Sequence, residues 1–217
     1  MTGSGPDGVL RLAAGELRVA LWIDHTYTRG SADNVHAYDR EVVFADGGPH
    51  SWQAVGVRVS EGERVLGSAV LLLPLGCGEP GRATIVARPH TLYLPAGTEV
   101  AALDLPSLEV RWRTESSIGC VMGLHERPDD EGLIVHGEIS VARVEPDGRV
   151  AWEHAGRDIF SGALRIAGDA VEVTDQDGEL HRFRVSDGEI LQAPPSRRTP
   201  EPPPARGWMD RLRGWLG

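Results

Sequence analysis

The stretch that decides the fold is ARVEPDGRVAW, which runs from Ala142 to Trp152. A similar stretch, ALDLPSLEVRW, runs from Ala102 to Trp112, and a third, RFRVSDGEILQ, runs from Arg182 to Gln192, so that successive copies are 40 residues apart. The apolar and aromatic positions that keep this spacing are Val110, Val150, Ile190, Trp112 and Trp152. A fixed period of about 40 residues in a chain of short strands indicates repeated sheet units, each of which needs a neighbour to bury its faces.

The rest of the chain is also typical of β structure. Short apolar and β-branched runs, such as LRVALWI at 17–23 and EVAALDL at 99–105, are separated by Gly, Pro, Asp and Ser. Asp-Gly pairs at 147–148, 177–178 and 187–188 favour tight hairpin turns, because glycine accepts a positive φ. Such close spacing leaves no room for crossover helices, so we expect antiparallel sheets.

The repeated stretch resembles the repeat of PQQ-like (quinoprotein-type) β-propellers, in which a strand reading like ALD runs through a turn into a strand that ends in tryptophan. The resemblance covers residues 88–191 as three repeats, and it implies four-stranded blades with Trp112 and Trp152 docked between neighbours. The sequence departs from the pattern at Leu108, where a turn glycine is expected, and at the third copy, which lacks its tryptophan. Because three blades do not close a ring, residues 9–87 should supply degenerate blades or a separate β-domain; an open stack completed by a second chain is the alternative.

The resemblance does not extend to a cofactor. PQQ-dependent dehydrogenases are larger propellers that need a calcium site, and we recognise no such site in this sequence. The chain has no G-x-S-x-G elbow and no CxxC pair, and it has no lysine for a P-loop or a Schiff base. We therefore expect a non-enzymatic protein without a cofactor.

The charge is unevenly placed. The net charge is −10, but residues 194–217 hold five arginines against Glu201 and Asp210, which is a net of +3 and leaves −13 on the rest. An acidic body argues against nucleic acid as a partner. We expect neither a signal peptide nor a membrane span. With only Cys77 and Cys120 as cysteines, we expect a cytoplasmic location.

The densest polar cluster, DHTYTRGSADNVHAYDRE, covers residues 24–41. Its candidates for metal binding or acid–base work are His25, His36 and Asp39, and the alternative interpretation is a solvated loop between strands. Four further histidines are scattered in the repeats, where they would line a channel or sit hydrogen-bonded on strand faces: His125, His136, His154 and His181.

The C-terminal residues differ in composition from the rest. The proline-rich residues 194–206 predict an extended tether, and residues 207–217 predict a short amphipathic helix. The residues expected to bind a partner are Trp208, Met209, Leu212, Trp215 and Leu216. So short a helix is not stable alone in water, so it should order only against another surface. We expect docking to another protein, as in cargo-loading tails of bacterial protein shells; the alternatives are capping of its own domain and binding at an anionic membrane surface.

The sequence thus predicts an all-β, propeller-like domain over residues 9–193, preceded by a flexible segment at 1–8 and followed by the tether and docking peptide. The predicted function is a non-enzymatic protein-binding scaffold that is recruited to an assembly through its C-terminal segment. One alternative is an immunity or antitoxin-like protein that neutralises a basic toxin by charge complementarity. Another is a small metal-dependent hydrolase built on residues 24–41.

Overall fold

The computed structural model describes residues 7–45, 51–76, 84–127 and 130–192. Within them the chain forms four β-sheets and no helix, as expected of an all-β protein. None of the described residues belongs to a helix that could span a membrane. The predicted tether and docking peptide, residues 194–217, lie outside the described residues, as does most of the segment 1–8.

The first sheet has five strands in the order β1-β2-β4-β5-β3. Their bounds are Leu10–Ala14 (β1), Leu17–Ile23 (β2), Arg40–Val43 (β3), Trp52–Glu61 (β4) and Arg64–Pro74 (β5). Strand β3 pairs with β5 in parallel, whereas the other pairs in this sheet are antiparallel. Residues 24–39 connect β2 to β3 and carry the chain across the sheet.

The other three sheets have four strands each, paired in sequence order and antiparallel. The second sheet contains β6 (Val86–Arg88), β7 (Thr91–Ala96), β8 (Glu99–Asp104) and β9 (Val110–Glu115). The third contains β10 (Val121–Arg127), β11 (Asp130–Gly137), β12 (Ser140–Val144) and β13 (Val150–Ala155). The fourth contains β14 (Arg165–Ala167), β15 (Ala170–Thr174), β16 (Leu180–Arg184) and β17 (Ile190–Gln192).

The three copies of the repeated stretch form the last hairpin of each four-stranded sheet. The residue pairs that face each other nearest the turn are Leu103 with Val110, Val144 with Val150, and Phe183 with Ile190. The middle hairpin is therefore one residue shorter, and each ladder has a register shift beside the turn. The 40-residue period of the sequence corresponds to one sheet.

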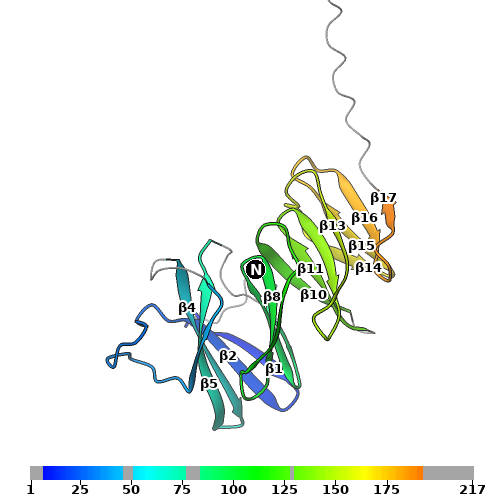
Figure 1. Cartoon of the computed structure of the whole chain (residues 1–217). Helices are drawn as coiled ribbons and strands as arrows, with labels where there is room; N and C mark the ends of the chain where they lie inside the picture. Colours follow the sequence, from blue (N-terminus) through cyan, green and yellow to red (C-terminus); the bar gives the residue numbers. More distant parts are fainter. Residues whose placement is uncertain (1–6, 46–50, 77–83, 128–129, 193–217) are drawn as a thin grey trace, which may run out of the picture.

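Successive sheets pack face to face across three apolar cores, which we call the first, second and third seams. Strands of the inner sheets are buried on both faces: in β7, Leu92 and Leu94 belong to the first seam and Tyr93 to the second. Figure 1 shows the sheets following one another across the molecule, with β5 and β17 at opposite ends. The described sheets thus form an open stack.

Both end faces of this stack carry polar groups. On the fourth sheet, Arg182 of β16 pairs with Glu172 of β15 at 3.0 Å, and Arg184 pairs with Asp187 at 3.1 Å and with Glu189. On the first sheet, residues 24–39 lie over the outer face. Polar end units of this kind are typical of repeat arrays.

Candidate functional site

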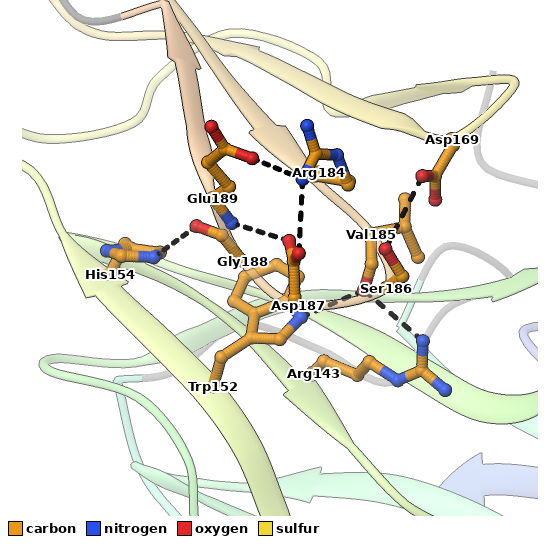
Figure 2. A network of polar contacts seen from close by, with 10 residues as sticks. All are labelled: Arg143, Trp152, His154, Asp169, Arg184, Val185, Ser186, Asp187, Gly188 and Glu189. Carbon is orange, nitrogen blue, oxygen red and sulfur yellow. Dashed lines mark hydrogen bonds and ion pairs between the residues drawn. The ribbon is translucent and has the colours of Figure 1, made fainter.

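The tryptophans of the repeat lie between neighbouring sheets. Trp152 of the third sheet donates a hydrogen bond from Nε1 to the backbone oxygen of Val185, 2.9 Å away in the fourth sheet (Figure 2). Its indole covers Gly188, where a Cβ atom would stand 2.7 Å from the ring. Trp112 repeats this arrangement one sheet earlier, on the oxygen of Pro146 at 2.9 Å and against Gly148. Each indole therefore links two neighbouring sheets, Trp112 at the second seam and Trp152 at the third seam.

The other repeat positions have less uniform surroundings. Val150 is half-buried against the second seam, whereas Val110 and Ile190 are 40% and 52% exposed. Leu108, at the position of the turn glycines Gly148 and Gly188, keeps a positive φ of 58° and is fully buried in the first seam. It fills the first seam, where no repeat tryptophan is present.

The histidines of the repeats have structural partners in the third seam. His136 donates to the oxygen of Phe160 at 3.0 Å, and His154 donates to the oxygen of Gly188 at 2.6 Å (Figure 2). His181 contacts the buried carboxylate of Asp175 at 3.0 Å. His125 is different, because its Nε2 is buried without a hydrogen-bond partner. Burial and the neighbouring His136 lower the pKa of His125 to about 4.

A hollow lies on the outer face of the first sheet. It has a volume of about 490 Å³ and is open to solvent, and we call it the outer pocket. Its walls come from the loop 24–39, the start of β3 and one residue of β5, and the side chains used below are Tyr27, His36, Tyr38, Asp39, Glu41 and Val70. Ligand pockets in proteins usually measure about 300–1,000 Å³, so the hollow is large enough for a small molecule or one long side chain.

The loop over this face is held at both ends by its own polar side chains. At its start, the buried Asp24 accepts hydrogen bonds from the backbone and hydroxyl of Thr26, at 3.0 and 2.6 Å, and from Tyr38 at 2.7 Å. At its end, Asp39 accepts from the backbone and hydroxyl of Ser68 in β5, both at 2.8 Å. Between them, Asn34 bonds to the backbone of Thr28 and Ser31. The pocket is therefore formed before any ligand arrives.

Aromatic rings form one side of the outer pocket. Tyr38 stacks on Trp22 with ring centroids 6.2 Å apart and meets Tyr27 edge to face at 6.0 Å. His36 meets Trp22 at 5.6 Å, also edge to face. Trp22 lies against β4 because its neighbour there is Gly56, where a Cβ atom would stand 2.4 Å from the indole. The rings are thus fixed against the sheet.

Both tyrosine hydroxyls donate to carboxylates. Tyr27 donates to Glu41 at 2.5 Å, and burial together with this bond raises the pKa of Tyr27 to about 12. Burial and the bond to Asp24 also raise the pKa of Tyr38. Burial alone would raise the pKa of Asp24, but the bonds from Thr26 and Tyr38 outweigh it and lower that pKa. At neutral pH both phenols therefore stay neutral, and the carboxylate of Asp24 beside Tyr38 is ionised.

The residues proposed from sequence do not form a metal centre here. His36 and Asp39 line the outer pocket, whereas His25 lies in an exposed turn. Within the described parts of the chain, no three His, Cys, Asp or Glu side chains are grouped closely enough to hold a metal ion. The sequence reasoning missed Tyr27 and Tyr38, although both stand inside the segment that it singled out.

Two further predictions fall partly outside the described residues. All five predicted partner-binding side chains lie in the segment 207–217, outside them. Cys120 is disulfide-bonded, and Cys77 lies outside them too. The cytoplasmic location, which rests on the small number of cysteines, is not tested by these observations and stays a prediction.

The fold defines an all-β protein built as a stack of four sheets, with the outer pocket on one end face. No protein-family profile and no curated protein matches the sequence. Among solved structures, it is similar to the designed protein Ika8 (13% identity, TM-score 0.47, 84% of this chain and 59% of that chain). It is also similar to the Cps50 (Swd1) β-propeller domain of Myceliophteria thermophila (11% identity, TM-score 0.46), in an alignment that covers 66% of this chain and 57% of that chain.

A third similar structure is a europium-containing methanol dehydrogenase (16% identity, TM-score 0.44). The alignment covers 53% of this chain and 24% of the dehydrogenase. The chain therefore spans less than two thirds of the length of each of these three proteins. These neighbours include β-propeller proteins, and at such identities they say nothing of the function.

Proposed function

We propose that the protein is a non-enzymatic protein-binding module that is recruited to a partner assembly through its C-terminal segment. The observation that carries the proposal is that the four-sheet stack ends in polar faces and presents one preformed pocket at an end. Such a stack supplies a rigid platform without needing a ring. The basic, tryptophan-containing segment 207–217 supplies the attachment.

The supporting argument is that the distinctive side chains of the repeats have structural partners. Trp112 and Trp152 bond across seams to backbone oxygens, and His136 and His154 do the same in the third seam. Groups held in this way stabilise the stack. The outer pocket and the C-terminal segment are then the parts left for recognition.

The test of the proposal is a truncated chain that ends at residue 193. We expect it to keep the β circular-dichroism spectrum of the full chain and to lose partner recovery in a pull-down. A matched control is the full chain with Trp208→Ala and Trp215→Ala, which keeps the tether but removes the aromatic anchors. Unchanged recovery by both variants would overturn attachment through this segment.

One alternative function keeps its own test. An antitoxin-like role, favoured by the net charge of −10, predicts tight and salt-sensitive binding to a basic toxin encoded beside this gene. The metal-dependent hydrolase is not proposed, because His25 and His36 belong to no group of described side chains that could hold a metal ion.

A further inference from the structure

From the outer pocket we infer a binding site for a basic side chain, a guanidinium or an ammonium group, presented by a protein partner. The inference deepens the proposed binding function, but it concerns the first sheet and not the C-terminal segment. It is carried by the hollow itself, by its fixed aromatic wall and by the direction of its hydrogen bonds.

The hydrogen bonds of the pocket leave acceptors facing the hollow. Tyr27 and Tyr38 each use the hydroxyl proton on a carboxylate, so that their oxygens are left with lone pairs only. Glu41 and Asp39 add carboxylate oxygens at the start of β3. A ligand rich in donors complements such a wall, whereas an anion does not.

The one arginine among the lining residues turns away to another sheet. The guanidinium of Arg40 pairs with Glu109 at 3.2 Å, so its charge is engaged outside the pocket. The carboxylates of Asp39 and Glu41 line the hollow, with the imidazole of His36 beside the rings, and Arg29 of the loop pairs with Glu41. Two carboxylates against this one guanidinium leave the lining with a net negative charge. The balance of charge in the pocket therefore favours a cation.

One guanidinium of the chain already pairs with a carboxylate of the pocket. Arg29, which is 56% exposed, approaches Glu41 from the loop with its Nε 2.8 Å from the carboxylate, and Glu41 also accepts the hydroxyl proton of Tyr27. Carboxylates and aromatic faces each attract a cation in proteins. A partner's arginine or lysine entering the hollow would meet carboxylates and tyrosine rings, and the acidic body would steer it there.

The experiment is a calorimetric titration of the full chain with the peptide Gly-Gly-Arg-Gly-Gly, its Lys form and its Glu form, each acetylated at the N-terminus and amidated at the C-terminus so that only the central side chain is charged. We expect saturable binding of the Arg and Lys peptides, with a Kd of about 1 mM for a single side chain, and no binding of the Glu peptide. Glu41→Gln should weaken binding by about tenfold, because it removes the charged acceptor. Glu63→Gln makes the same charge change at an exposed turn of the same sheet and should leave binding unchanged.

A second variant keeps the inference testable if Glu41→Gln perturbs the loop. Arg29→Gln removes the internal competitor for Glu41 and should strengthen peptide binding by about threefold. Absence of saturable peptide binding, equal weakening by Glu63→Gln, or saturation by a neutral disaccharide in place of the peptides would each overturn the inference. The truncated chain ending at residue 193 keeps the outer pocket but lacks the C-terminal segment. Peptide binding by this truncated chain therefore tests the pocket independently of the proposed C-terminal attachment.

Discussion

Leu108 occupies, with a φ of 58°, the turn position that Gly188 occupies with a φ of 77° two repeats later. The N–H of each residue bonds to the carbonyl four residues before it, Asp104 for Leu108 at 2.7 Å and Arg184 for Gly188 at 2.8 Å. Both turns are thus closed by the same kind of hydrogen bond, although only the Leu108 turn contains a cis peptide bond, Leu105–Pro106, and the side chains differ. Gly188 leaves room for an indole, whereas Leu108 fills the seam itself.

Replacing Leu108 with glycine should therefore destabilise the protein despite relieving the backbone. Loss of the buried leucine costs about 4 kcal/mol in unfolding free energy, and release from the left-handed region returns about 1–2 kcal/mol. We expect a net loss of about 2 kcal/mol in urea denaturation. Leu92→Ala, in the same seam, gains no such relief; if the two variants lost equal stability, or Leu108→Gly gained it, this account would be wrong.

Replacing Gly188 with alanine should destabilise more than the same change at Gly178. Both glycines have a positive φ, 77° and 82°, so both substitutions cost about 1–2 kcal/mol in the backbone. Only at Gly188 does the new methyl group meet the Trp152 indole, at 2.7 Å, whereas Gly178 has open space. We expect an additional loss of about 1–3 kcal/mol at Gly188. Thermal unfolding of the two variants side by side measures the difference, and equal midpoints would argue against a tight indole–turn contact.

The third seam should weaken in mild acid because of His125. Its pKa is about 4 in the folded chain against 6.5 for an ordinary histidine, so the unfolded chain binds more protons below pH 6.5. The stability that a neutral His125 contributes is complete above pH 6.5 and is lost progressively as the pH falls to 4, by about 3 kcal/mol. Denaturation at several pH values should show a shallower slope in His125→Phe than in the native chain.

A variant at the exposed His90, His90→Gln, controls for the loss of one histidine in that experiment. His136 also has its pKa lowered by burial, so some slope should persist in His125→Phe. An identical slope in the native chain and in His125→Phe would show that His125 does not contribute to the acid sensitivity.

Removing the hydroxyl of Tyr38 should loosen the outer pocket. Tyr38→Phe takes one of the three hydrogen bonds from the buried Asp24, which costs about 1–2 kcal/mol in unfolding free energy. The same change should raise the pKa of Asp24, because a bond that stabilises its ionised form is lost. Chemical denaturation and NMR titration of the carboxyl measure the two effects. A carboxyl that titrates as before would mean that the hydrogen bond is unimportant.

Much of the repeat region was predictable from the chain. The positions of the three final hairpins and the shorter middle turn follow from residues 102–192, because each hairpin is a local structure with its own turn residues. The outer pocket was only half predictable. Its polar residues stand in one segment, but Val70 joins them only through the pairing of β5 with β3, which places it opposite Glu41.

The sequence by itself determined the all-β class and the 40-residue unit, since alternating apolar residues and turn glycines act within a few residues of one another. Only the tertiary structure set the five-stranded sheet of the strands between Leu10 and Pro74, with its parallel edge strand, and the replacement of an indole by Leu108 in the first seam. It also decided that Tyr27, Tyr38 and Glu41 share one hollow. These outcomes depend on which faces meet when sheets stack, and that is set by packing between residues far apart in the chain.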